Sequence, residues 1–132
     1  MNLAAEISVG EFLDKITILE IKSGRISDPA KLENINKELS ILRRTWADSA
    51  FSQGDIAGEI AELKTINEKL WDIEDDIRLK ESRQEFDDDF IRLARAVYFI
   101  NDDRAAVKRK INLKLGSALV EEKSYADYRA MK

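Results

Sequence analysis

The sequence predicts an all-α fold, an antiparallel bundle of four main helices whose last two form a long hairpin, followed by a short C-terminal tail. Apolar residues recur at spacings of three and four over roughly half of the chain, which is the period of a helix with a buried face. No segment of strand length shows convincing two-residue alternation bounded by turn residues. A length of 132 residues with five glycines and one proline suits a single domain over 1–132.

The first helix is expected from Val9 to about Ile26. Ser8 and Glu11 have the spacing of a capping box, in which the two side chains satisfy free N–H groups at the start of a helix. The apolar residues that follow cover more than one side of the helix, so we expect it to contact several neighbours and to lie centrally. They are Phe12, Leu13, Ile16, Ile18, Leu19 and Ile21.

The second helix is expected to begin at Pro29, because Asp28 is a good N-cap and proline is tolerated at the first helical position. Its apolar residues form an uninterrupted heptad pattern that ends before a loop at 49–54. They are Leu32, Ile35, Leu39, Leu42 and Trp46.

The third helix is expected to begin near Asp55 and to end before a polar turn at 81–85. The fourth is expected from about Asp88 to Leu115, because Gly116 is a typical helix stop. A weaker pattern over 117–128 is compatible with a short helix in the tail. The strongest apolar stripe of the third helix consists of Leu63, Ile66, Leu70, Ile73 and Ile77.

The helix lengths do not match, and this predicts a dimer. The last two helices, at about 28 residues, would be about 42 Å long, whereas the first two would reach only about 27 to 30 Å. The tip of the long hairpin should therefore overhang, and its apolar residues need a cover from the tail or from a second subunit. We expect a homodimer that uses this tip. The residues are Ile77, Leu79, Phe86, Phe90, Ile91 and Leu93.

The chain contains no histidine and no cysteine. This excludes Ser-His-Asp triads, cysteine nucleophiles, disulfides and the usual zinc sites, and it leaves carboxylates, Lys, Arg, Tyr and Ser for any chemistry. A net charge of −4 argues against nucleic-acid binding by the whole surface. The longest apolar run, 96–100, is too short to cross a bilayer, so we expect a cytoplasmic protein without membrane insertion and without a cofactor.

Two charged clusters are candidates for a polar pocket. Charges on a central first helix must be paired or line a cleft, because an unpaired buried charge is strongly destabilising. These charges are Asp14, Lys15, Glu20 and Lys22. A hairpin turn near Gln84 would bring a second set together, as cross-hairpin salt bridges or as a pocket. This set consists of Asp72, Asp75, Asp76, Arg92 and Arg95.

No metal site is predicted. The clustered carboxylates could bind Mg²⁺ or Ca²⁺, but their spacing matches no calcium loop and lacks the Glu-x-x-His of di-iron bundles. Asn67 and Asn101 interrupt the apolar stripes of the last two helices, and a buried asparagine is typical of a residue that fixes the register of a bundle.

The segment 104–114 carries five positive charges and no negative one. Such a run is usually a solvated helix face, but arginines and lysines on adjoining turns can also converge on a phosphate. No glycine-rich phosphate loop accompanies it. The candidate anion-binding residues are Lys15, Arg104, Lys108, Arg109 and Lys110.

Three segments, SVGEFLDKITILEIK at 8–22, NEKLWDIEDDIR at 67–78 and NDDRAAVKRKINLKLGSALVEEKSY at 101–125, make the chain resemble a family of small bacterial helical proteins known only as a domain of unknown function. The resemblance implies no established activity and no catalytic residues. The resemblance also associates the chain with relatives that occur beside sugar-transferring enzymes of surface polysaccharide synthesis, which favours a partner role. A stretch LWDIEDDIRL has a likeness to helical chorismate mutases, but the flanking arginines are missing.

Two functions are compatible with these observations. The first is a non-enzymatic interaction or scaffold module that self-associates through its long hairpin and binds another protein. The second is an anion-binding protein for phosphate, nucleotide or sugar nucleotide, or a small enzyme that works by electrostatics.

Overall fold

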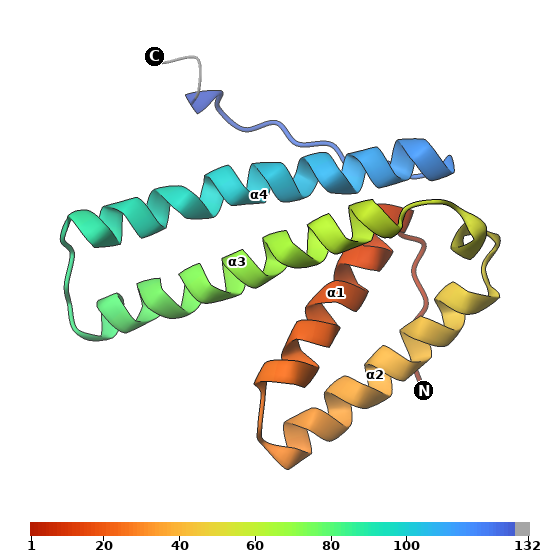
Figure 1. The fold of residues 1–132 in the computed structure, drawn as a ribbon, viewed down its shortest axis with the longest axis horizontal. Coiled ribbons are helices and arrows are strands. Elements are labelled where there is room, and N and C mark those ends of the chain that lie inside the picture. Colours follow the sequence, from red (N-terminus) through yellow and green to blue (C-terminus); the bar gives the residue numbers. More distant parts are fainter. Residues whose placement is uncertain (129–132) are drawn as a thin grey trace.

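The computed structural model describes residues 1–128, and this part of the chain contains four α-helices and one short 3-10 helix (Figure 1). The all-α prediction is confirmed. Helix α3 lies against α4 in a long hairpin, the shorter α1 packs against one end of it, and α2 packs against α1. The elements are α1 (Val9–Arg25), α2 (Pro29–Asp48), η1 (Ala50–Gln53), α3 (Ala57–Ser82) and α4 (Asp88–Leu115).

Three of the helix boundaries follow from their capping residues. The Ser8 side chain accepts from the Glu11 N–H at 3.1 Å, and the Asp28 side chain accepts from the Lys31 N–H at 3.0 Å. Gly116 ends α4 with a left-handed φ of 69°. The capping box is only half formed, because the Glu11 carboxylate accepts from Lys108.

Helix α3 begins later than predicted, at Ala57 rather than near Asp55. Its N-cap is Ile56, which makes no side-chain cap and is 2% exposed. The apolar side chain of Ile56 packs into the core at this point. This packing sets the start of the helix, and the Asp55 carboxylate does not.

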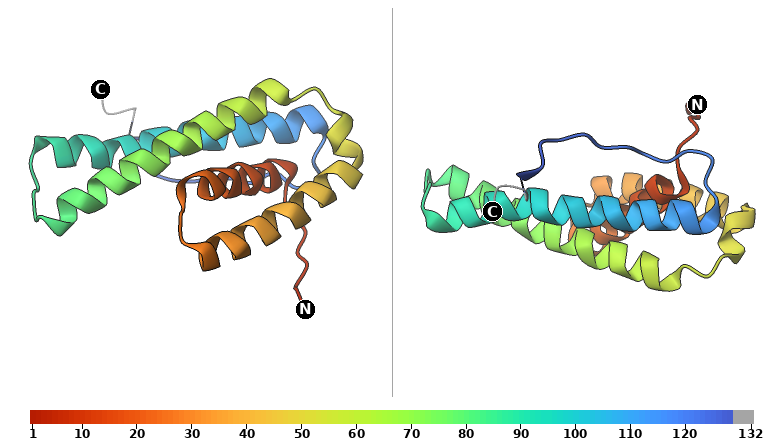
Figure 2. Two further views of the ribbon diagram at one scale, coloured as in Figure 1. Left: turned by 60° about the horizontal axis from the view of Figure 1, so that its bottom comes forward. Right: turned by 90° about the horizontal axis from the view of Figure 1, so that it is seen from above.

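Helix α1 is the centre of the core, as predicted. Figure 2 shows it between α2 and the α3–α4 hairpin, and its buried residues face both. Helix α2 lies at the edge, and Leu39 is its only buried residue. The other residues of its predicted heptad stripe are half-buried. The buried core consists of Val9, Leu13, Ile16, Leu19, Leu39, Ile56, Leu63, Ile66, Leu70, Val107 and Ile111.

The tip of the α3–α4 hairpin extends beyond α1 and α2, as the helix lengths predicted (Figure 1). The turn passes through Gln84 with a left-handed φ of 55°. Of the six predicted interface residues, Leu93 is 7% exposed and so presents little surface to a partner. The remaining five are exposed or half-buried.

The C-terminal segment 117–128, hereafter the tail, is not the short helix that its pattern allowed. After Gly116 the chain turns back and runs without helix over 117–127 along α4 (Figures 1 and 2). Glu121, Glu122 and Lys123 are paired with residues of α4, so contacts with distant partners hold the tail in place. Among residues 1–128, no helix combines the length and apolarity that crossing a membrane requires.

Candidate functional site

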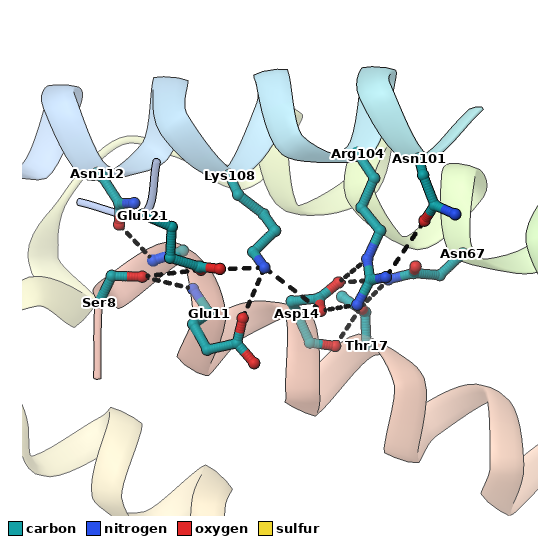
Figure 3. A network of polar contacts seen from close by, with 11 residues as sticks. Ser8, Glu11, Asp14, Thr17, Asn67, Asn101, Arg104, Lys108, Asn112 and Glu121 are labelled. Carbon is teal, nitrogen blue, oxygen red and sulfur yellow. Dashed lines mark hydrogen bonds and ion pairs between the residues drawn. The ribbon is translucent and has the colours of Figure 1, made fainter. Parts of the chain in front are cut away.

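A network of polar side chains joins α1 to α4 and the tail, with one contribution from α3 (Figure 3). We call it the α1–α4 network. Its members are Ser8, Glu11, Asp14, Thr17, Asn67, Asn101, Arg104, Lys108, Asn112 and Glu121.

Asp14 lies at the centre of the network and is 1% exposed. Its carboxylate accepts from both Nε and Nη2 of Arg104, the first at 3.0 Å, and from Nδ2 of Asn67 at 2.9 Å. Asn67 also donates to the Thr17 hydroxyl at 2.9 Å, and that hydroxyl donates to the Asp14 carbonyl at 2.8 Å. The prediction that charges on a central α1 must be paired is therefore correct for Asp14.

Lys108 occupies the next turn of α4 and is surrounded by carboxylates. Its Nζ donates to Glu11 at 2.6 Å, lies 3.1 Å from a Glu121 oxygen and lies 4.0 Å from Asp14. Burial by itself would lower the pKa of Lys108, but hydrogen bonds with Glu11 and Glu121 outweigh it, and the pKa lies above the ordinary 10.5. The ammonium is therefore charged at neutral pH.

Ion pairing also shifts the pKa values of Arg104 and Glu121, each in the direction that favours the charged form. Hydrogen bonding to Asp14 raises the pKa of Arg104. Burial would raise the pKa of Glu121, but its hydrogen bond with Lys108 brings it below the ordinary 4.5. Both shifts favour the charged form of the group at neutral pH.

The N-terminus of α1 is pressed against α4. A Cβ at Gly10 would lie 2.5 Å from the Lys108 carbonyl oxygen, so only glycine fits this approach. The Gly10 N–H donates to Asn112 Oδ1 at 2.6 Å, and the Val9 N–H donates to Ser117 Oγ at 3.2 Å. These first N–H groups of the helix are used inside the protein, and they do not form an anion site.

The other charges predicted on α1 are not gathered with Asp14. Glu20 accepts from Arg43 of α2 at 2.8 Å and lies 3.9 Å from Lys64 of α3, so it links three helices at the opposite end of α1. Lys15 is exposed and Lys22 is half-buried, and both lie outside the network.

The predicted cross-hairpin set does not form among the described residues. Asp72 pairs with Arg25 of α1 at 2.5 Å, because the C-terminal end of α1 reaches α3 at this point. Arg92 pairs with Asp89 on its own helix, and Arg95 lies over the Phe99 ring at 6.0 Å. Asp75 and Asp76 are exposed.

The cations of 104–114 do not converge on one point. Arg104 and Lys108 are one turn apart and face α1, whereas Arg109 pairs with Glu122 of the tail at 3.0 Å. Lys110 lies on the side of α4 that faces α3, where it lines a shallow pocket with Lys69. The predicted anion site of five cations, which also included Lys15, is therefore not assembled.

The tail and α4 enclose a half-open cleft of about 590 Å³. Its lining includes three tyrosines and four cations, which are Tyr98, Tyr125, Tyr128, Arg104, Lys108, Arg109 and Lys123. Sequence patterns do not indicate that these tyrosines lie together, because their gathering depends on the path of the tail.

Residues 3–130 match a family described as a family of unknown function, DUF6165. The chain belongs to this family. The resemblance to an uncharacterised helical family is thus confirmed, and the DUF6165 match covers all four helices and the described tail. No curated protein and no solved structure matches the chain.

The network of this DUF6165 protein is built to hold helices together. Within residues 1–128, every buried side-chain nitrogen and oxygen has a hydrogen-bond partner. Arg104 and Lys108 could stabilise a negative charge, but their donors are directed at carboxylates of the chain itself. An external anion would have to displace one of those carboxylates, and Glu121 is the most exposed of the three around Lys108.

Sequence reasoning missed Glu11, Thr17, Asn112 and Glu121 as members of the network. A signal for some of them is present in the sequence. On α4, Asn101, Arg104, Lys108 and Asn112 recur at spacings of three and four, which places them on one face. On α1, Asp14 and Thr17 interrupt an otherwise apolar face at the same period, so a polar stripe on each helix indicated a polar interface.

Proposed function

We propose that this DUF6165 protein is a non-enzymatic interaction module that self-associates as a homodimer through the tip of its α3–α4 hairpin and presents the dimer to another protein. The observation that carries the proposal is the exposed apolar surface of the overhanging tip. Leu79 is 52% exposed, Phe86 57% and Ile91 53%. Three large apolar side chains on one protruding element are typical of an interface.

The surroundings of these residues fit a contact between two copies. Phe86 packs edge-on against Phe90 with ring centroids 5.1 Å apart, so it is held in a fixed position. Beside Ile91, a shallow groove on α4 is lined by Ala96, Phe99 and Ile100, with Arg92 and Arg95 at its rim. An apolar centre with arginines around it is the common composition of protein interfaces.

A dimer with twofold symmetry could form through this surface alone. In a twofold dimer the same patch serves both partners, so the tip of one hairpin can cover the groove of the other and receive the same cover in return. The buried side-chain nitrogens and oxygens of residues 1–128 all have partners inside the protein, which supports a binding role over a catalytic one. A location in the cytoplasm stays a prediction from the sequence.

The proposal is tested by the double variant Phe86→Ser/Ile91→Ser in sedimentation velocity and light scattering. We expect a dimer for the wild type and at least a 100-fold rise in the dimer dissociation constant for the variant, since each interface would lose two anchors on each side. The matched control is Ile41→Ser/Leu113→Ser, because both residues are exposed apolar side chains away from the tip. A wild type that is monomeric at high concentration would sink the proposal.

A second candidate, an anion-binding protein or small electrostatic enzyme, is favoured by the cleft beside Lys108 and Arg109. Here the ligand would replace a tail carboxylate on those cations. A thermal-shift screen with phosphate, nucleotides and sugar nucleotides separates the candidates, because a ligand at 100 times its Kd stabilises a fold by about 2.7 kcal/mol. Under the first proposal none of these compounds raises Tm.

A further inference from the structure

The tail is attached to α4 by contacts that resemble those of a bound peptide. Along its length, Glu121 lies 3.1 Å from Lys108, Glu122 accepts from Arg109 at 3.0 Å, and Lys123 donates to Asp102 at 2.9 Å. The tail therefore runs antiparallel to α4.

An aromatic contact follows at the far end of the tail. The Tyr128 ring lies 4.9 Å from the ring centroids of both Tyr98 and Phe99, edge-on to Phe99, and its hydroxyl donates to Asp102 at 2.5 Å. Charged contacts at one end and a ring contact at the other fix the tail at two separate places.

The tail is not part of the core. None of its described residues is fully buried, Leu119 is 47% exposed and Tyr125 is 83% exposed. Exposed ion pairs hold a segment weakly, and they weaken further with salt. The seven residues from 121 to 128 would reach about 23 Å if extended, whereas α4 rises only about 15 Å over the ten residues from 108 to 98. The tail is therefore longer than the distance that it spans. Its release would therefore leave the buried core of the helices unchanged.

The surface of α4 beneath the tail has a definite chemical pattern. Lys108 and Arg109 lie at one end, and the rings of Tyr98 and Phe99 lie at the other. About 590 Å³ of open space remains between α4 and the tail, so a second chain can enter before the first has left. This pattern complements an extended segment with adjacent carboxylates followed by an aromatic residue.

We propose that this face of α4 is a docking groove for an extended acidic segment of a partner protein. Two carboxylates of the partner bind Lys108 and Arg109, and an aromatic ring packs on Tyr98 and Phe99. The tail occupies the groove in cis and is displaced when the partner binds. The tail itself supplies the argument for this chemistry, because it places Glu121, Glu122 and Tyr128 at those points. The inference does not depend on self-association at the hairpin tip.

The probe is a synthetic peptide with the sequence of residues 117–128, labelled at its N-terminus and titrated with the full chain by fluorescence anisotropy. In the variant Glu121→Gln/Glu122→Gln the competing tail is weakened, so we expect the peptide to bind at least tenfold more tightly than to the wild type. Arg109→Gln added to this variant should weaken binding at least tenfold. Arg109 is suitable because, among residues 1–128, it forms its ion pair with Glu122 and not with a member of the α1–α4 network, so its loss leaves that network intact.

Displacement of the tail is measured separately. Because the chain has no cysteine, Ser124→Cys gives a single site for a mobile fluorophore or spin label on the tail. The mobility of this label should rise with the same peptide concentration dependence as the anisotropy. A control peptide has both glutamates replaced by glutamine and both tyrosines by alanine.

The outcomes separate the proposal from its rivals. Equal binding of the two peptides, or no binding to the Glu121→Gln/Glu122→Gln variant, overturns it. An unchanged label mobility at peptide saturation overturns it as well, since the peptide would then bind elsewhere. Energy transfer between donor-labelled and acceptor-labelled copies of the Ser124→Cys chain that also carry Phe86→Ser/Ile91→Ser, which removes association through the tip, would assign the groove to the tail of a second copy and would reject a partner protein.

Discussion

The variant Asp14→Asn should destabilise the fold far more than the loss of any surface charge. The Asp14 carboxylate is 1% exposed and is the counter-ion of Arg104. Asparagine keeps one acceptor oxygen for Asn67 and for one arm of the guanidinium. It replaces the second oxygen by an amide that donates, so two donors face each other where an ion pair was.

The size of the effect follows from burial. Removing one partner of a buried ion pair costs about 3 to 5 kcal/mol, because the remaining charge is left uncompensated. The Arg104 side chain is 28% exposed and can regain part of its hydration. We therefore expect a loss of about 2 to 3 kcal/mol, a large part of the roughly 5 to 15 kcal/mol that stabilises a domain.

The assay is urea unfolding followed by circular dichroism, arranged as a double-mutant cycle with Arg104→Gln. Because the two side chains act as one unit, the double variant should be more stable than the sum of the single losses by about 1.5 kcal/mol or more. Glu74→Gln is the matched control, since Glu74 pairs with Arg78 on the surface of α3, and it should cost less than about 0.5 kcal/mol. A loss below about 1 kcal/mol for Asp14→Asn, or strict additivity, would refute the reasoning.

Two further predictions concern the N-terminus of α1 and the tail. Gly10→Ala should cost about 1 to 3 kcal/mol in urea unfolding, because the new Cβ would lie 2.5 Å from the Lys108 carbonyl; a stabilised variant, the usual result of this change in an exposed helix, would contradict the close approach. The tail should detach as pH falls below 4.5. The pKa of Glu121 is lowered in the folded state, so its ion pair with Lys108 stabilises the attached tail above pH 4.5 and is lost once Glu121 is protonated; the other charged groups around this contact are Glu11 and Asp14. At alkaline pH the pKa of Lys108 is raised, so the contact between Lys108 and Glu121 is fully kept up to the ordinary pKa of 10.5 and is lost as the pH rises further. The label at Ser124→Cys reports both transitions, and a tail that stays immobile at pH 3 would disprove the ionic attachment.

Local sequence signals predicted the fold well. Ser8, Asp28 and Gly116 set helix ends through bonds to their own neighbours, so their effect is visible in a few consecutive residues. The tail could not be predicted in this way. Its conformation depends on charges of α4, including Lys108 and Asp102, that lie more than ten residues away in the sequence.

The candidate site was predictable in part. The cost of burying a charge on α1 identified Asp14 as a residue that needs a partner, and the charge run identified Arg104 and Lys108 as cations. The pairing between them depends on how two helices cross, and helix period alone does not contain that information. The same limit explains Arg92 and Arg95, which a hairpin register placed opposite acidic residues but which face the groove beside Phe99.

The α1–α4 network also determines the order in which the chain can fold. Its contacts join residues 90 apart for Asp14 and Arg104, 97 apart for Glu11 and Lys108, and 102 apart for Gly10 and Asn112. Closing a loop of this length costs about 4 kcal/mol in chain entropy, whereas the α3–α4 hairpin closes through a short turn. During synthesis at roughly 5 to 20 residues per second, α1 waits for about 5 to 20 seconds before its partners on α4 exist. Helix α1 can pair with α2 early through the short connection at 26–28, but the face of α1 that carries Asp14 stays uncovered until α4 has been made.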